Sequence, residues 1–248
     1  MKSRQAEHVI FCPHLPLGLW IVPTINATSK STKDGLSIAT KQITTIKIQS
    51  PIIEILVGGP YKSIDEEHTY GHVALRVITS ANEFVYDFGR YNGESGPFGQ
   101  GRLRVWTKFA KYIAGENATG RTTTGFVYKV PSELAANVNT HFTSLIANRP
   151  VLKAYVDHMK EYRLAVDYHA LNNNCTTTAM TGVRVAIRDL DYDVPTYNVG
   201  TGMSFVEKMG AKGAGWPSYI FMPADLQKML ENNPRHRPDK VEKFGGAK

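Results

Sequence analysis

The sequence predicts an α+β fold in which an antiparallel sheet packs against helices. The first observation is a hairpin, because apolar and polar residues alternate in 70–77 and again in 83–89, with turn residues at 80–82 between them. The second is a helical pattern in 176–187, where apolar residues recur at spacings of three and four. Asn174 precedes this pattern and is a favourable N-cap residue.

The expected strands occupy the first half of the chain. They are 43–48, 52–57, 70–77, 83–89, 103–106 and 125–130. The run 52–57 ends at the turn signal Gly58-Gly59-Pro60, which favours a buried strand that stops there. A glycine-rich loop, 92–101, follows the hairpin and is long enough to have a function of its own.

The expected helices occupy the second half. They are 133–147, 151–165, 175–189, 203–209 and 224–232. Ser132 is predicted to cap the first of them and Asn174 the third, since both side chains accept hydrogen bonds from first-turn amides.

Three regions are predicted along the chain. Residues 1–40 form an extension of unknown role, which ends in the polar stretch 29–35. Residues 41–233 form the main domain, and the polar residues 234–248 form a flexible tail. A chain of 248 residues, of which 42% are hydrophobic, is long enough to bury one substantial core.

The formal net charge of +7 favours anionic partners such as cell-wall polymers, nucleic acid or lipid headgroups. The basic residues are scattered rather than gathered in a stripe, so we expect no nucleic-acid binding. The sequence contains no run of ~18 apolar residues, so we expect neither a membrane span nor stable membrane insertion. The apolar stretch 9–23 is interrupted by Pro13, His14 and Pro16, so we expect no cleavable signal.

Cys175 is the candidate nucleophile. It lies directly after the predicted cap Asn174, in the first turn of a helix, where the dipole and the free amides favour a thiolate. The same amides could stabilise an oxyanion. Two cysteines do not predict a disulfide scaffold, and a bridge between Cys12 and Cys175 would abolish the nucleophile.

His72 is the candidate base and Asp87 the group that orients it. His72, Ala74 and Arg76 share one face of their strand, and Val73, Leu75 and Val77 share the other. Asp87 lies on the partner strand of the hairpin, where it could reach the imidazole. The three residues would form a triad of nucleophile, base and orienting acid.

The motifs Gly71-His72-Val73-Ala74-Leu75-Arg76, Tyr86-Asp87-Phe88-Gly89 and Asn174-Cys175-Thr176 resemble those of papain-like cysteine peptidases of the NlpC type. Because the histidine and aspartate precede the cysteine, the order resembles circularly permuted members. The group typified by the Lnb N-terminal periplasmic domain is the most similar that we can name. The resemblance covers about residues 52–232 in layout, and roughly 20 residues carry the motifs.

The resemblance implies a papain-like fold with the nucleophile at a helix N-terminus, no cofactor and no metal. It implies a cysteine peptidase or amidase that cuts amide bonds in peptidoglycan stem peptides, as some antibacterial secreted effectors do. Such a toxin would be made in the bacterial cytoplasm, exported, and active in the periplasm of a target cell. An immunity protein and a component of a secretion apparatus are then expected partners. Residues next to the triad are candidates for substrate binding: Asn174, Thr176, Tyr70 and Gly71.

Two rival sites carry less weight. Cys12 could be the nucleophile in the unpermuted order, but Pro13 and Pro16 disfavour a helix start there. His68 and His72 have the spacing of a zinc pair, yet Thr69 stands where a metalloprotease has its glutamate. On a strand, positions four apart are also ~13 Å apart, which is too far to share a metal.

Three other functions stay open from the sequence alone. The permuted layout also occurs in lipid acyltransferases and phospholipases, which should show an amphipathic or membrane-spanning anchor. A protein-directed cysteine peptidase would use the same chemistry. A catalytically inactive adaptor with the same fold is the third. We expect the walls of the cleft to come from 92–101 and 196–202, whose glycines permit a close approach of substrate.

Overall fold

The computed structural model describes residues 24–28, 40–44, 50–62, 67–91, 96–155 and 157–245, and the chain divides into two units, 1–50 and 51–248. In the first unit, β1 (Thr24–Thr28) pairs antiparallel with β2 (Thr40–Thr44). The strand predicted at 43–48 therefore starts earlier, and residues 45–49 lie outside the described residues. The same holds for most of the predicted 1–40 extension, including Cys12.

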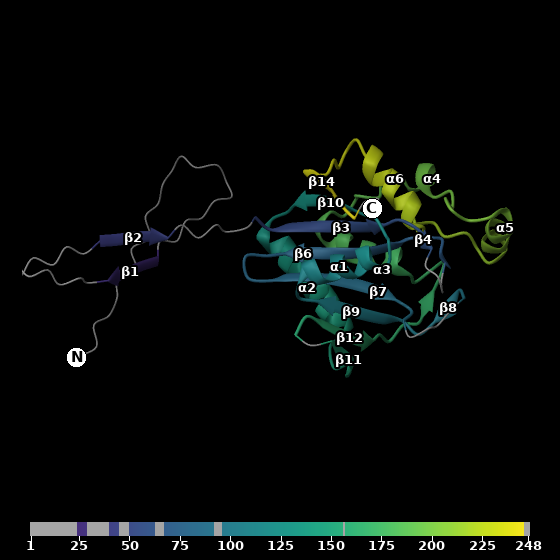
Figure 1. Ribbon diagram of the computed structural model, residues 1–248. Helices are drawn as coiled ribbons and strands as arrows, with labels where there is room; N and C mark the ends of the chain where they lie inside the picture. Colours follow the sequence, from purple (N-terminus) through teal and green to yellow (C-terminus); the bar gives the residue numbers. More distant parts are fainter. Residues whose placement is uncertain are drawn as a thin grey trace, which may run out of the picture. The chain divides into compact units, whose positions relative to one another are not determined.

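The second unit is built on an eight-stranded sheet whose pairs are all antiparallel (Figure 1). The strand order is β11-β12-β9-β7-β6-β3-β10-β14. In chain order the strands are β3 (Ile52–Gly58), β6 (His72–Ile78), β7 (Glu83–Gly89), β9 (Arg102–Trp106), β10 (Thr123–Lys129), β11 (Val151–Tyr155), β12 (Met159–Arg163) and β14 (Lys240–Phe244). Two short pairs lie outside this sheet: β4 (Tyr61–Lys62) with β5 (Glu67–His68), and β8 (Phe98–Gly99) with β13 (Tyr168–His169).

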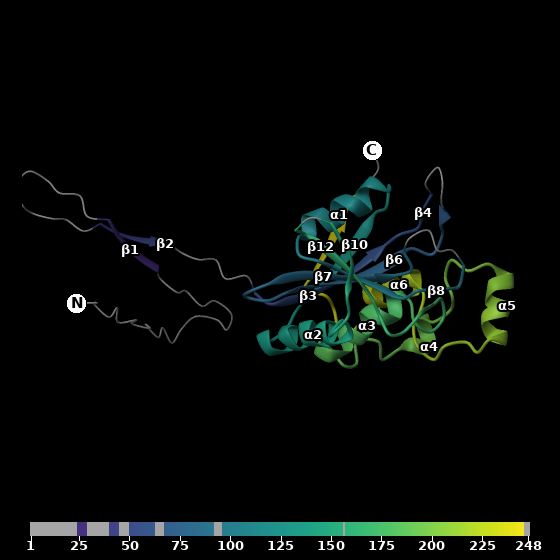
Figure 2. The ribbon, with the colours of Figure 1, turned by 90° about the horizontal axis from the view of Figure 1, so that it is seen from below.

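Helices cover both faces of the sheet (Figure 2). They are α1 (Phe109–Ala118), α2 (Ser132–Leu145), α3 (Cys175–Ala186), α4 (Val194–Tyr197), α5 (Phe205–Gly213) and α6 (Pro223–Asn232). Helices α2, α3 and α6 lie on one face and α1 on the other. The predicted α+β class, with an antiparallel sheet packed against helices, is confirmed.

The alternation of β6 divides its side chains between two cores, as the sequence predicts. Val73, Leu75 and Val77 point into the larger core, beneath α2, α3 and α6. Ala74 belongs to the smaller core beneath α1, together with Tyr112. His72 is two residues before Ala74, so the larger core fixes the strand while His72 lies on the other face.

The helix predicted at 151–165 is wrong, because this segment forms the hairpin of β11 and β12. The preference of this segment for a helix is weaker than the effect of ion pairs that join β12 to the neighbouring strand. Glu161, which is fully buried, accepts from Arg102 Nη1 and Arg104 Nε, each at 2.8 Å. A buried carboxylate needs such partners, and both arginines lie on the neighbouring strand β9.

The tail predicted to be flexible contains the edge strand β14. Its entry is fixed by Asp239, whose Oδ2 accepts from Lys129 N at 2.8 Å and whose N–H donates to Val127 O at 2.8 Å. At its end, the ring of Phe244 packs edge-on against Phe109, with centroids 5.2 Å apart. The polar composition of 234–248 conceals this single apolar anchor.

Some boundaries differ from those predicted. Ser132 is the first residue of α2 rather than its cap, since Pro131 occupies the N-cap position without a side-chain cap. Helices α1 and α4 were not predicted. Helix α1 buries Tyr112 and Ile113 on the smaller core, a stripe too narrow to stand out in the sequence. The helix predicted at 203–209 runs over Phe205–Gly213 instead.

Candidate active site

Cys175 is the first residue of α3, and its position is fixed by a complete capping box around Asn174. Thr177 N donates to Asn174 Oδ1 at 3.0 Å, and Asn174 N donates to Thr177 Oγ1 at 2.9 Å. The Asn174 amide also donates to Ala170 O at 2.6 Å and Phe221 O at 2.9 Å. The cap therefore ties the start of α3 to two other segments, as the N-cap prediction implies locally.

The cap leaves two amides at the helix start unused. A helix begins with four backbone N–H groups that have no acceptor inside it. The backbone amides of Asn174 and Thr177 each donate to the other residue's side chain, so the backbone amides of Cys175 and Thr176 remain. No acceptor for these two amides is found among the described residues. They are the groups that could stabilise an oxyanion beside the sulfur.

His72 and Asp87 come together across the hairpin of β6 and β7. Asp87 is paired with Ala74 in the register, and His72 lies diagonally from it on the same face. The imidazole Nε2 of His72 lies 2.6 Å from Asp87 Oδ1. With Nε2 occupied by this carboxylate, Nδ1 is the ring nitrogen available to the thiol.

The surroundings of Cys175 favour its ionised form. Burial of the thiol opposes ionisation, but the charge of His72 and a hydrogen bond from it lower the Cys175 pKa below its ordinary value. The backbone of Val73 and the hydroxyl of Thr176 lower it further. The Thr176 side chain is completely buried, and its Oγ1 has no hydrogen-bond partner in ordinary geometry among the described residues.

The pKa of His72 is shifted in the opposite direction. Burial would lower it, but the charges of Asp87 and Cys175 and the hydrogen bonds to them raise the pKa to about 10. Asp87 is buried as well, yet its pKa is lowered by His72, by a hydrogen bond from Tyr91 and by the charge of Arg104. The arrangement therefore favours a thiolate and imidazolium pair held by a carboxylate.

Two residues behind Asp87 complete this arrangement, and the sequence did not reveal them. Tyr91 Oη donates to Asp87 Oδ1, and burial raises the pKa of Tyr91 so that it stays a neutral donor. Arg104, paired with Asp87 across β7 and β9, stacks its guanidinium 3.4 Å from the centroid of the Tyr91 ring. A Cβ at Gly89 would lie 3.0 Å from this ring, so glycine in the Tyr-Asp-x-Gly motif gives Tyr91 its space.

The residues predicted to bind substrate have other roles in the structure. Asn174 is 4% exposed and uses its side-chain oxygen and nitrogen in the cap, and Thr176 is buried. Gly71 has a φ of 77°, and a Cβ there would lie 2.5 Å from Gly58 O, which explains glycine before His72. Tyr70 is 42% exposed and donates its hydroxyl to Glu207 on α5. Of the four, Tyr70 is the one whose side chain a substrate could reach.

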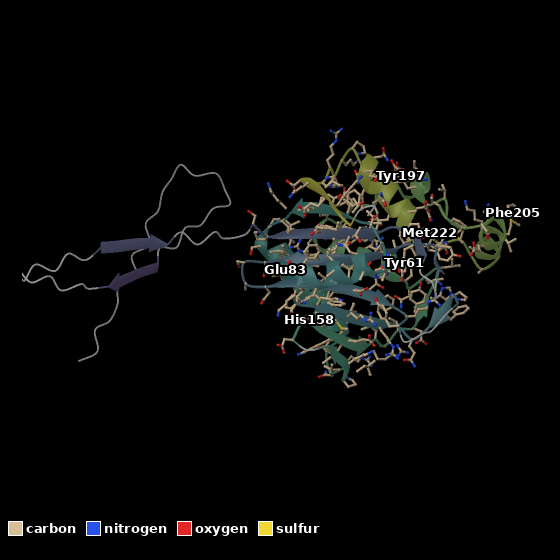
Figure 3. All side chains as sticks on the ribbon, in the orientation of Figure 1. Tyr61, Glu83, His158, Tyr197, Phe205 and Met222 are labelled. Atoms are coloured by element: carbon tan, nitrogen blue, oxygen red, sulfur yellow. The ribbon has the colours of Figure 1, made fainter. Side chains whose placement is uncertain are left out.

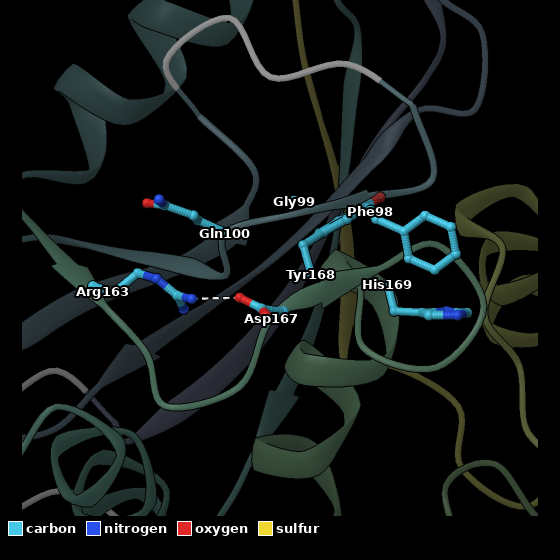
Figure 4. Close-up of a pocket in the computed structure, with 7 residues that line it drawn as sticks. All are labelled: Phe98, Gly99, Gln100, Arg163, Asp167, Tyr168 and His169. Carbon is cyan, nitrogen blue, oxygen red and sulfur yellow. Dashed lines mark hydrogen bonds and ion pairs between the residues drawn. The ribbon is translucent and has the colours of Figure 1, made fainter.

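An open pocket of about 640 Å³ lies beside the cysteine loop (Figure 4). It is lined by Phe98, Gly99, Gln100, Arg163, Asp167, Tyr168 and His169. Phe98 and His169 lie edge to face, 4.9 Å between centroids, and Arg163 pairs with Asp167. Burial and the charge of Cys175 raise the pKa of Tyr168 to about 12.

This pocket contains part of one predicted wall and none of the other. Residues 98–100 belong to the predicted loop 92–101, whereas 92–95 lie outside the described residues. No residue of 196–202 lines it. That second segment lies near Thr69 instead, since a Cβ at Gly202 would be 3.9 Å from Thr69 O.

The rival sites are not supported by a second observation. Cys12 lies outside the described residues, as does the side chain of His68. Among the residues that the structure describes, no group of three or more His, Cys, Asp or Glu side chains is placed to hold a metal ion. No described helix has the length and apolar character to cross a membrane.

Comparison with known proteins gives no relative. No family model, no curated protein and no solved structure matches the chain. The class of protein that the coordinates define is an α+β protein with an eight-stranded antiparallel sheet packed against helices.

Proposed function

We propose that the chain is a cysteine hydrolase of the permuted NlpC-type papain-like class, with Cys175 as nucleophile, His72 as base and Asp87 as the orienting residue. The observation that carries the proposal is the convergence of three distant side chains at a capped helix start. The 2.6 Å contact of His72 Nε2 with Asp87 Oδ1 leaves Nδ1 for the sulfur. The lowered pKa of Cys175 supports a thiolate as the resting nucleophile.

The proposed reaction is hydrolysis of an amide. The Cys175 thiolate attacks the carbonyl carbon, and the free amides of Cys175 and Thr176 stabilise the oxyanion that forms. As the carbon–nitrogen bond breaks, the His72 imidazolium gives its proton to the leaving amine. Neutral His72 then takes a proton from water, whose oxygen attacks the thioester and releases the acid and the thiolate.

A peptidoglycan stem peptide is the substrate that we propose. The support is the resemblance of the three sequence motifs, together with a formal net charge of +7 that favours anionic wall polymers. On this proposal the chain acts as a secreted antibacterial effector in the periplasm of a target cell. An immunity protein that blocks the pocket beside Tyr168 would be its natural antagonist.

A lipid ester is the second candidate substrate, because one observation favours it. Helix α5 exposes Phe205, Val206 and Met209, which is the apolar element that a lipid enzyme needs and that the sequence did not reveal.

The test compares substrates and variants together. Purified protein is incubated with peptidoglycan sacculi, with phospholipid vesicles and with ubiquitin conjugates, and the products are identified by mass spectrometry. We expect new amine ends from sacculi, lost in Cys175→Ser and kept in Cys12→Ser. Fatty acid release from vesicles would replace the peptidoglycan proposal with the lipid one. Activity that survives Cys175→Ser would overturn the proposed nucleophile, and a wild type inert on all three substrates would favour an inactive adaptor.

A further inference from the structure

Helix α5 has its apolar side chains on the outside. Phe205 and Val206 are each 78% exposed and Met209 is 52% exposed. With 3.6 residues per turn, these three residues share one face, while Glu207 and the buried Ala211 lie on the opposite one. A surface helix in a soluble protein normally has the reverse pattern. Figure 3 labels Phe205 at the outer end of this helix, away from the sheet.

A capping box fixes the start of the helix, and hydrogen bonds tie the segments before and after it to the rest of the fold. Its capping box joins Ser204 and Glu207, with Ser204 N donating to Glu207 Oε2 at 2.7 Å. The loop before it is held by the buried carboxylate of Asp225, which accepts from the amides of residues 199–201 at 2.7 to 3.1 Å. On the other side, Trp216 Nε1 donates to Asn198 O at 3.2 Å.

The charges around the exposed face are positive. The one carboxylate on α5, Glu207, is exposed on the opposite side of the helix and accepts hydrogen bonds from Ser204 and Tyr70. Lys208 and Lys212 lie along one side of the apolar face; Lys212 is exposed, whereas Lys208 is half-buried with its side chain near Gly200. The face therefore presents apolar side chains with a cationic border, and the chain as a whole carries +7. This combination is complementary to an anionic lipid surface, where Lys ammonium groups meet phosphates while apolar side chains enter the acyl boundary.

The size of the patch favours a membrane over a protein partner. Three side chains on a projecting helix are too few for a stable protein interface, which buries ~1,200 Å² or more. They suffice for reversible binding at a lipid interface. Figures 1 and 2 agree that α5 projects beyond the end of the sheet, where a flat surface could reach it.

We infer that the exposed face of α5 is a docking site for an anionic membrane surface, with Phe205, Val206 and Met209 inserting between headgroups and Lys208 and Lys212 contacting phosphates. The hydroxyl of Tyr70 links α5 to the residues just before His72, so docking would bring the candidate active site to the membrane. Docking does not depend on the proposed hydrolysis, because none of these five residues touches Cys175.

Sedimentation with vesicles tests the inference. The Cys175→Ser chain, which cannot turn over, is mixed with vesicles of equimolar phosphatidylglycerol and phosphatidylcholine, or of phosphatidylcholine alone. We expect binding to the anionic vesicles that weakens with added salt. The triple change Phe205→Ser, Val206→Ser and Met209→Ser should weaken binding about tenfold or more. The single change Lys212→Gln should weaken it about fivefold.

A matched control removes apolar surface elsewhere. Val151 and Leu152 on β11 are each 45% exposed, and changing both to serine should leave vesicle binding unchanged. Circular dichroism and thermal unfolding check that every variant folds. Equal binding by the triple variant and its parent would overturn the inference, as would no binding to anionic vesicles or equal binding to neutral ones. Self-association of the parent without lipid, abolished by the triple change, would reassign the face to a contact between copies of the chain.

Discussion

At the scale of single residues, the reactivity of Cys175 depends on the neighbouring imidazole. The thiol is 8% exposed, and burial alone would raise its pKa. The charge of His72 has a larger effect on the Cys175 pKa than burial does. The thiolate should therefore persist at pH values at which an ordinary thiol is protonated. As the pH rises, His72 loses its proton near its pKa of about 10, and only then is the ion pair of thiolate and imidazolium lost.

The first prediction concerns the pH dependence of alkylation. In a Cys12→Ser background, Cys175 is the one remaining thiol. Its rate of reaction with iodoacetamide should rise through a midpoint below the ordinary thiol pKa. In His72→Ala the midpoint should move above that of the parent, since burial remains and the opposing charge is gone. His236→Ala, whose imidazole pairs with Asp189 rather than with Asp87, is the control. Coincident midpoints for parent and His72→Ala would refute the ion pair.

The second prediction separates the charge of Asp87 from its orientation. Asp87→Asn removes the largest cause that raises the His72 pKa, so this pKa should fall, as ring NMR titration would detect. Hydrolysis should fall by ~10²–10⁴-fold. Tyr91→Phe keeps the carboxylate and removes one donor to it, so the His72 pKa should stay above its ordinary value and the rate should fall about tenfold. Equal losses of rate in Asp87→Asn and Tyr91→Phe would mean that the charge of Asp87 contributes nothing and that its side chain only fills space beside His72.

At the scale of elements, the start of α3 and the strand β6 are where local sequence determines the site. The cap Asn174 and the alternation around His72 are short-range signals, so Cys175, His72 and Asp87 could be chosen from the sequence. Arg104 could not, because its place behind Asp87 depends on the pairing of β7 with β9. Non-local pairing has no signature within a single strand.

The third prediction tests the cap. Asn174→Ala removes an acceptor and two donors that are buried, so the free energy of unfolding should fall by about 2–3 kcal/mol. Ser204→Ala breaks the other capping box, which is exposed, and should cost about 1 kcal/mol or less. Urea denaturation measures both. Equal costs would mean that the ties from Asn174 to Ala170 and Phe221 contribute nothing.

The fourth prediction concerns the glycine before His72. Gly71→Ala places a Cβ 2.5 Å from Gly58 O at a φ of 77°, so we expect a loss of about 1–3 kcal/mol in unfolding free energy. Gly115→Ala, inside α1 with nothing within 4 Å of its Cβ, should instead stabilise by about 0.5–1 kcal/mol. The two changes add the same methyl group with opposite effects. Stabilisation by Gly71→Ala in urea denaturation would contradict the strain argument.

At the scale of the whole molecule, the strands of the eight-stranded sheet that the sequence did not predict lie at its two ends. The edge strands β11 and β14 are short and carry lysines, so their apolar pattern is weak. Charged edges are common because they prevent pairing with other chains, and the same charges hide the strand from pattern analysis. The central strands β3, β6, β7 and β10 are buried on both faces and were predicted near their observed positions.

The last prediction follows from β14 as an edge. Truncation after Pro238 removes Asp239 and the five residues of β14, so β10 loses one of its two ladder partners and Phe109 loses the ring of Phe244. The free energy of unfolding should fall by about 2–4 kcal/mol.

The newly exposed edge of β10 should also make the truncated chain associate, as light scattering would detect. Truncation after Gly245 keeps β14 and is the matched control, for which we expect neither effect. Because β10 and β3 separate β14 from the strand that carries His72, alkylation of Cys175 at low temperature should be the same in both truncated chains. A slower reaction in the shorter chain would mean that the edge strand helps to hold the hairpin of β6 and β7. The sheet would then have to be treated as one cooperative unit from β14 to the candidate site.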